Sequence, residues 1–387
     1  SPVYLFWGRA FLIETTAVFL ALTMVALALW GFEKRSYSLL IAAGVVGILG
    51  ALCKAPTWGL AVGVTFLLLL IRADVYRREN WYWACGAIVA VALGFFAAKY
   101  WVAWSDAVKQ ANPFARELIT LNSENQRAWN YGTLEQKLNI KTWEVIFQHA
   151  IEGVLVKVPF LGAFFLPLVI IFAGALYPYR ALQMGAFVIA FLAGPLIFTN
   201  LYFQHSYYWI AYGACLLLGM GVAFSAIEEG VEEGGNWIAA GIGFVAVSFG
   251  FVNWNAIYKP ILDALPTRSQ LAEVWTEPVQ KFVPKERTLL VVGNDWNSNS
   301  LYYCDRKGIA FPNFYKIPFP GPQLAESLAN LQPHESLGAV VVAEPLFNQN
   351  KMIFEEFLKT HGFSLNGIQT AFGILFPANT FAEKKGE

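Results

Sequence analysis

Charged side chains are scarce in this chain of 387 residues, of which 14% are charged and 57% are hydrophobic. Soluble domains carry roughly 25% charged residues, so most of this chain is expected to lie in lipid. The 27 basic and 27 acidic residues cancel to a net charge of zero. This balance gives no reason to expect a nucleic-acid partner.

Cysteine is almost as scarce, and the four cysteines (Cys53, Cys85, Cys215 and Cys304) lie far apart. Their spacing excludes a disulfide framework and a metal-binding cluster. A glycine-rich nucleotide fingerprint is also missing, because Gly293 stands alone after the strand-like "LLVVG". The sequence contains no Ser-His-Asp order and no paired His-Glu metal motif. It therefore predicts no metal ligands and no definite cofactor. A divalent metal ion is left open as a cofactor.

Long apolar runs are what the chain has in abundance. A helix needs about 20 residues to cross roughly 30 Å of hydrocarbon. We predict about eight transmembrane helices, near residues 10–32, 37–53, 56–72, 81–103, 158–177, 181–200, 207–227 and 237–256. The second and third runs are short and are separated by "CKAP". This pattern predicts a tight hairpin, with Pro56 starting the next helix.

Basic residues in the short loops predict the orientation. Six of them are expected together on the cytoplasmic side: Lys34, Arg35, Arg72, Arg77, Arg78 and Arg180. The opposite turns are poor in basic residues, since Lys54 is alone in its turn. By this parity, two polar regions lie outside the cytoplasm. They are a loop at 105–157, with a short amphipathic helix near its end, and the stretch after Lys259.

From Thr288 onward, short β-branched runs alternate with helical stretches, which predicts a small α/β domain with a largely parallel sheet. The predicted fold class is therefore mainly α, a polytopic membrane helical bundle with a C-terminal extracytoplasmic α/β domain. We expect a transmembrane domain at 1–259, including the extracytoplasmic loop 105–157, and a soluble domain at 260–387.

Three ionisable residues at the outer ends of these helices are candidates for a site. Arg9 and Glu14 open the first apolar run, where a charge is costly unless it is paired or hydrated. Arg9 either extends to the interface, with Glu14 paired to it or to Lys54, or the two charges serve function. Lys54 is either an ordinary interface lysine or a cation that faces a lipid phosphate.

The decapeptide "NLYFQHSYYW" (200–209) lies at the same outer face. Tyrosine and tryptophan there are typical of an aromatic belt at a membrane interface. His205, however, stands among hydrogen-bonding side chains (Asn200, Gln204 and Ser206) that suit a phosphate or sugar hydroxyls. Both interpretations remain open. The substrate-binding candidates are Arg9, Lys54, His205, Tyr207 and Tyr208, with Glu14 in a supporting role.

Four stretches in order resemble landmarks of the GT-C family of polytopic glycosyltransferases. They are "SPVYLFWGRAFLIETTAVFLAL", "LCKAP", "WNYGTLEQKL" and "NLYFQHSYYW", and the similarity spans most of residues 1–256. The stretches resemble those of the dolichyl-phosphate-mannose protein mannosyltransferase and aminoarabinose transferase kind.

The resemblance implies an enzyme that moves a sugar from a polyprenyl-phosphate carrier to a lipid, protein or glycan acceptor outside the cytoplasm. It places Arg9, Lys54 and His205 around the phosphate or the donor, and Glu14 in support. The family's principal catalytic acid lies upstream of the segment that Ser1 begins. The catalytic residue is thus unassigned. Three explanations stay open: this chain is the C-terminal portion of a longer enzyme, which we favour, or a second polypeptide supplies the missing helices, or the protein has lost catalysis.

Two other classes of protein compete with this one. A non-catalytic membrane scaffold would use the extracytoplasmic domain to bind a partner. A transporter would show inverted repeats, and the sequence has no convincing repeat. The expected partners are a polyprenyl-phosphate sugar donor, membrane lipid and an unidentified acceptor. The expected location is a bacterial inner or plasma membrane.

Overall fold

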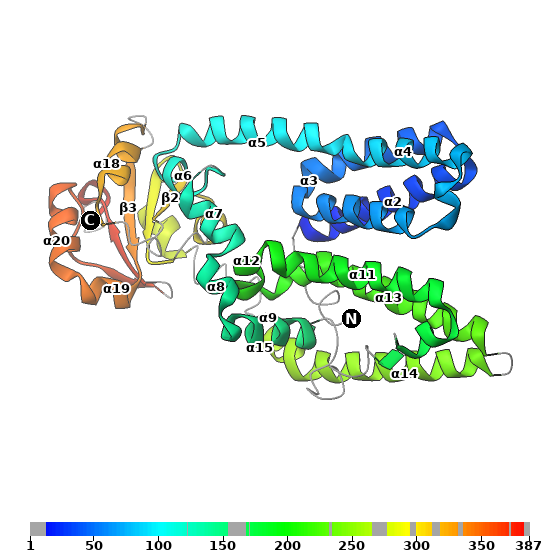
Figure 1. The fold of residues 1–387 in the computed structure, drawn as a ribbon. Coiled ribbons are helices and arrows are strands. Elements are labelled where there is room, and N and C mark those ends of the chain that lie inside the picture. Colours follow the sequence, from blue (N-terminus) through cyan, green and yellow to red (C-terminus); the bar gives the residue numbers. More distant parts are fainter. Residues whose placement is uncertain are drawn as a thin grey trace. The chain divides into compact units, whose positions relative to one another are not determined.

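The computed structural model describes residues 13–121, 123–153, 168–169, 171–231, 234–264, 277–294, 299–311, 318–331, 336–370 and 373–382. The chain divides into two compact units (Figure 1). Unit 1 comprises the chain up to Ala107 together with Leu121–Asp263, and unit 2 comprises Val108–Thr120 together with the chain from Ala264 onward. The segment Val108–Thr120 thus groups with the C-terminal part, which the sequence did not predict.

Among the described residues, six helical segments are long and apolar enough to cross a membrane. The chain is therefore an integral membrane protein. The segments are α2 (Ile13–Lys34), α3 (Tyr37–Leu70), α4 with α5 (Arg78–Ala92 and Gly94–Gln110), α11 (Pro178–Ile197), η2 with α13 (Ser206–Tyr208 and Trp209–Gly230), and α14 with η3 and α15 (Gly235–Asn253, Trp254–Tyr258 and Lys259–Ala264). Most of the predicted run 158–177 lies outside the described residues, so eight spans stay a prediction.

Helix α3 folds back on itself at Lys54, where the backbone leaves helical geometry (φ −158°, ψ 96°). A straight helix rises 1.5 Å per residue, so the two ends of α3 would otherwise lie roughly 50 Å apart. Instead, Ser36 donates its backbone N–H to Gly31, and Arg72 pairs with Glu33 at 2.6 Å. Both ends of α3 therefore lie beside the C-terminal end of α2. The predicted hairpin at "CKAP" is confirmed.

Charged residues gather around the two ends of α3. We call this region the Arg72 end of unit 1. Arg72 also contacts Asp74 at 3.1 Å, and Arg35 contacts Glu79 at 3.8 Å. The bond from Arg72 is the largest cause of the lowered pKa of Asp74. The opposite end of the hairpin holds Lys54 and is called the Lys54 end. Basic residues around the α2–α3 and α3–α4 turns thus share one end, as predicted, while the side of the membrane they face stays a prediction.

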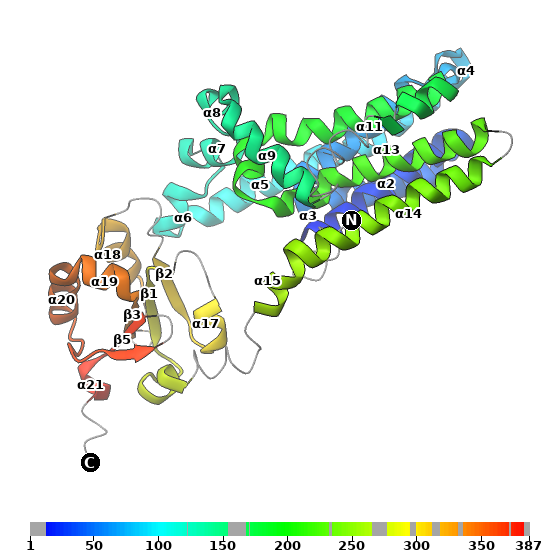
Figure 2. The ribbon, with the colours of Figure 1, turned by 90° about the horizontal axis from the view of Figure 1, so that it is seen from below.

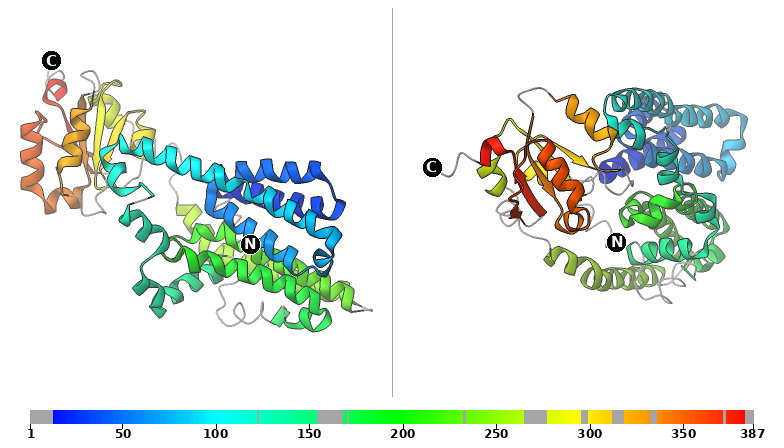
Figure 3. Two further views of the ribbon diagram at one scale, coloured as in Figure 1. Left: turned by 45° about the horizontal axis from the view of Figure 1, so that its top comes forward. Right: turned by 90° about the vertical axis from the view of Figure 1, so that its left-hand side faces the viewer.

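Helices α4 and α5 run end to end (Figure 3). After them, short helices build the Lys54 end of unit 1. They are α7 (Glu124–Tyr131), α8 (Leu134–Leu138), α9 (Ile140–Gly153) and α12 (Thr199–Gln204). Helix α9 is the short amphipathic helix predicted near the end of the 105–157 loop. Gly132, between α7 and α8, has φ +72°, a backbone conformation that residues other than glycine rarely adopt.

Unit 2 is built on a five-stranded sheet with strand order β2-β1-β3-β5-β4. The strands are β1 (Thr288–Val292), β2 (Gly308–Phe311), β3 (Leu337–Val342), β4 (Ile368–Thr370) and β5 (Gly373–Pro377). Strand β1 pairs in parallel with β2 and with β3, whereas β5 pairs antiparallel with β3 and β4. The sheet is mixed rather than largely parallel, because the short connection from β4 to β5 can join only antiparallel neighbours. The runs "TLLVVG", "GIAFP", "LGAVVVA" and "FGILFPA" were predicted as strands and are confirmed as β1, β2, β3 and β5, whereas β4 was missed.

Helices cover both faces of this sheet (Figure 2), so its central strands are apolar on both sides. One face packs on α18 (Pro322–Ala329), α19 (Glu344–Gln349) and α20 (Lys351–Thr360). The other face packs on Val279, Val283 and Cys304, the last just after α17 (Asn299–Tyr303). Helix α21 (Asn379–Ala382) follows the last strand.

Helix α6 (Pro113–Leu118) completes the first face, although it belongs by sequence to the loop between membrane helices. The ring of Phe114 meets the ring of Phe311 edge-on, with 5.6 Å between centroids. Arg116 pairs with Glu326 at 2.9 Å. This segment is therefore an integral part of the core of unit 2.

Candidate functional site

Lys54 and Glu14 form a buried ion pair at the Lys54 end of unit 1. Their side chains are 14% and 5% exposed. The break in α3 places the Lys54 ammonium at the start of α2, where Glu14 stands in the first helical turn. Among the described residues, the second carboxylate oxygen of Glu14 has no hydrogen-bond partner. Of the pairings that the sequence left open for Glu14, the one with Lys54 is present, and Arg9 lies outside the described residues.

A row of rings connects Lys54 with His205. The Lys54 ammonium lies 4.6 Å from the centroid of the Tyr208 ring, close enough for a cation–π contact. Tyr208 stacks on Tyr207 with 4.5 Å between centroids, and Tyr207 stacks on His205 with 5.1 Å. With Glu14, the structure therefore brings together five of the site candidates that the sequence singled out.

His205 is half-buried beside Trp129, with 6.0 Å between ring centroids. Burial, with a smaller contribution from nearby His149, lowers the pKa of His205 below its ordinary value of 6.5. The imidazole is therefore mainly neutral at pH 7. It can donate or accept one hydrogen bond, but it adds little positive charge to a phosphate site.

A cavity of about 720 Å³ opens beside Lys54. Its walls are mostly apolar and come from the second half of α3, from α11 and from α13. Besides Lys54, its polar lining consists of hydroxyl groups and one amide. These polar residues are Thr57, Asn130, Tyr131, Tyr202, Tyr208 and Tyr212. His205 and Tyr207 are not among the residues that line it.

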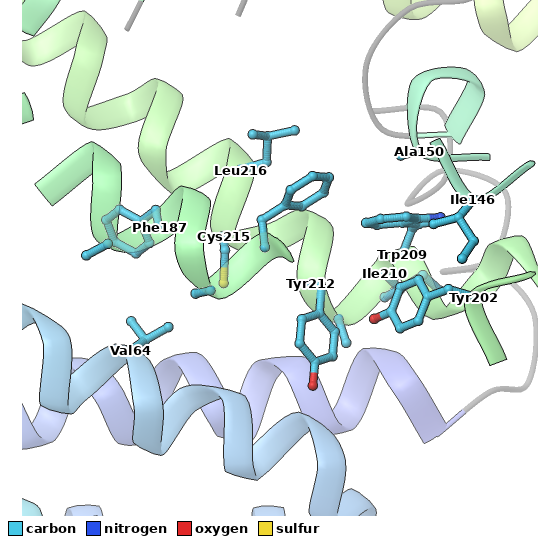
Figure 4. Close-up of a cluster of buried hydrophobic side chains, with 14 of the residues drawn as sticks. Val64, Ile146, Ala150, Phe187, Tyr202, Trp209, Ile210, Tyr212, Cys215 and Leu216 are labelled. Atoms are coloured by element: carbon cyan, nitrogen blue, oxygen red, sulfur yellow. The ribbon is translucent and has the colours of Figure 1, made fainter. Parts of the chain in front are cut away.

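Asn130, Tyr131, Tyr202 and Tyr212 were missed as site residues. The first two fall within "WNYGTLEQKL", which was noted only as a family landmark, so the signal was present without a role. Tyr212 donates its hydroxyl to the carbonyl of Pro56 at 3.4 Å. That long-range bond joins α13 to α3 at the wall of the cavity, and only the fold reveals it. Figure 4 shows the Tyr212 hydroxyl directed towards α3.

The decapeptide is less exposed than an aromatic belt would be. Trp209 is 0% exposed and Tyr202 is 1% exposed, and both belong to the core of unit 1 (Figure 4). Asn200 accepts a bond from Gln136 at 2.9 Å and donates one to the carbonyl of Trp129 at 2.8 Å. Its amide therefore fixes α12 to α7 and α8, rather than being free for a ligand as the sequence suggested.

No family model, curated protein or solved structure matches this chain.

Proposed function

We propose that this chain is a membrane glycosyltransferase that takes a sugar from a polyprenyl-phosphate carrier and transfers it, outside the cytoplasm, to a lipid, protein or glycan acceptor. The observation that carries the proposal is Lys54, a cation at the edge of a mostly apolar cavity of about 720 Å³. A lipid phosphate needs both features. Its hydrocarbon chain gains free energy against apolar walls, and its phosphate gains charge-assisted hydrogen bonds from an ammonium group.

The roles of the residues follow from their contacts. An ammonium group has three donors, and Glu14 accepts from one of them, which leaves Lys54 able to bond a phosphate as well. Glu14 supports the site by holding Lys54 at the start of α2. As sugar leaves the carrier, negative charge grows on the phosphate, and Lys54 stabilises it. Tyr208, which lines the cavity together with Lys54, would supply a weaker hydrogen bond, and Tyr207 and neutral His205 would support it through the stacked rings.

Binding of undecaprenyl phosphate to the purified chain in nanodiscs tests the proposal. The double variant Glu14→Gln/Lys54→Gln removes both charges and leaves no uncompensated charge in the pair. We expect its affinity to be lower by tenfold or more, because one charge-assisted bond contributes about 1.5–3 kcal/mol. Lys34→Gln, at the opposite end of α2, is the matched control and should bind normally.

Undecaprenol and inorganic phosphate separate the two parts of the ligand. The proposal expects both to bind more weakly than undecaprenyl phosphate. Equal binding of undecaprenol would remove the role of Lys54, and no saturable binding of undecaprenyl phosphate would overturn the proposal.

A membrane scaffold is the second candidate, and the independent core of unit 2 favours it. The candidates differ in what they need from the membrane unit. A scaffold does not need a lipid-phosphate site. Two results together would therefore favour the scaffold: the native chain does not bind lipid phosphate, and the Glu14→Gln/Lys54→Gln variant binds its protein partner normally.

A further inference from the structure

Strand β2 forms one edge of the sheet in unit 2, and a cavity of about 400 Å³ lies against it. Strand β2 supplies Gly308, Ile309 and Ala310 to its wall, α6 and its flanks supply the facing wall, and the C-terminal part of α18 closes one side. We call this cavity the β2 groove. Its volume is within the range of ligand sites in proteins.

The backbone of β2 turns unused hydrogen-bonding groups towards this edge. Leu289 donates its N–H to the carbonyl of Lys307, which fixes the pairing pattern of β2 with β1. In a parallel ladder, Lys307 and Ile309 then face β1, and Gly308 and Ala310 direct their N–H and C=O groups outward. In the described part of the chain, these outward groups have no hydrogen-bonded strand beside them.

We infer that the β2 groove binds an extended peptide as an additional strand. The outward groups recur every second residue, about 6.6 Å apart, which matches the repeat of another strand and not that of sugar hydroxyls. Phe114 and Ile309 give the groove an apolar floor for alternate side chains of the peptide. Such pairing takes affinity from main-chain bonds and specificity from side-chain contacts. The inference concerns unit 2 alone and does not depend on sugar transfer.

A backbone-modified peptide is the sharpest probe of this inference. The probe is the fluorescein-labelled heptapeptide Lys-Thr-Val-Thr-Val-Thr-Lys, titrated against the purified full chain and followed by fluorescence anisotropy. Two control peptides carry N-methyl groups on alternate residues, one in each register, so that each blocks the amides of one edge. We expect saturable binding of the parent peptide and at least tenfold weaker binding of one control peptide. Equal affinity for all three peptides would contradict strand addition.

Ala310→Pro and Ala310→Gly form a matched pair in the protein. Proline removes the outward N–H, which a sheet edge tolerates, whereas glycine keeps it. We expect at least tenfold weaker peptide binding for Ala310→Pro and less than threefold change for Ala310→Gly. Circular dichroism verifies folding, and the N-methyl peptides decide the matter if Ala310→Pro does not fold. A groove that binds the oligosaccharide chitohexaose and not the peptide would overturn the inference.

Discussion

Lys54 and Glu14 illustrate how the membrane environment constrains individual residues. Each charge would be costly to bury alone, and the pair is tolerated because the two groups meet. Lys54 reaches Glu14 only because α3 breaks at that residue.

Removing one partner of this pair should therefore cost more than removing both charges. Lys54→Ala leaves the Glu14 carboxylate buried without a cation, so we expect a loss of about 3–5 kcal/mol in the free energy of unfolding. Glu14→Gln/Lys54→Gln should lose much less. Thermal unfolding in detergent compares the two variants. A smaller loss for Lys54→Ala than for the double variant would show that leaving Glu14 unpaired carries no such cost.

The lowered pKa of His205 makes a prediction about pH. The folded protein binds this proton less readily than the unfolded chain, so His205 contributes full stability above pH 6.5. Stability should fall as pH drops below 6.5 towards the folded pKa. His205→Gln should flatten this part of the profile. Unfolding temperatures between pH 5 and pH 8 provide the measurement, and an identical slope in His205→Gln would refute the assignment.

At the scale of elements, the hairpin in α3 decides which side chains meet. It returns the chain to the end where α2 finishes, and it leaves Lys54 at the other end beside the start of α13. Two apolar half-helices thus become neighbours of α2, α11 and α13, and the cavity beside Lys54 lies along the second of them.

Chemical cross-linking can test this hairpin. In a variant without native cysteines, Glu33→Cys and Arg72→Cys should be joined efficiently by a short bismaleimide, because the native side chains lie 2.6 Å apart. The control pair is Glu33→Cys and Lys54→Cys. Glu33 lies near the end of α2 and Lys54 lies beside its start, so helical rise separates the two positions by roughly 25 Å. Mobility on denaturing gels reports the linked loop. A straight α3 would link neither pair, so failure of the Glu33–Arg72 pair to cross-link would contradict the hairpin.

At the scale of the whole molecule, the two units differ in how their cores arise. The core of unit 1 is built from membrane helices, whereas unit 2 alternates side chains on two covered faces of a sheet. Unit 2 also includes α6, a segment from the middle of the chain.

Cleavage of the chain should reveal this shared construction. Cleavage at a protease site inserted between Ala264 and Glu277 would break the covalent connection between the C-terminal part and the membrane helices. We expect the fragment to remain bound after cleavage, because Phe114 is buried in its core. Phe114→Ala should release it, since such truncations cost about 3–5 kcal/mol.

Arg116→Ala is the milder control and should retain the fragment, because the ion pair of Arg116 with Glu326 is exposed to solvent and contributes little to stability. Co-purification of the fragment with the membrane part measures retention. If the fragment dissociates immediately after cleavage of the chain with native Phe114 and Arg116, α6 does not hold it.

The sequence by itself determined the features that depend on local pattern. Apolar runs predicted the membrane helices, "CKAP" predicted the turn at Lys54, and β-branched runs predicted four of the strands. The physical reason is that solvent and backbone sterics act on neighbouring residues. Choice of Lys54, Tyr208 and His205 also came from sequence, because polar groups at the edge of lipid are conspicuous.

Only the tertiary structure decided the pairings between distant residues. Asn200 looked free for a ligand, and its amide instead joins α12 to α7 and α8. Trp209 looked like part of an interfacial belt, and its ring is fully buried. The grouping of α6 with unit 2 was equally invisible. These outcomes depend on which surfaces meet after the chain has folded. The local sequence pattern does not predict which distant residue a side chain will contact.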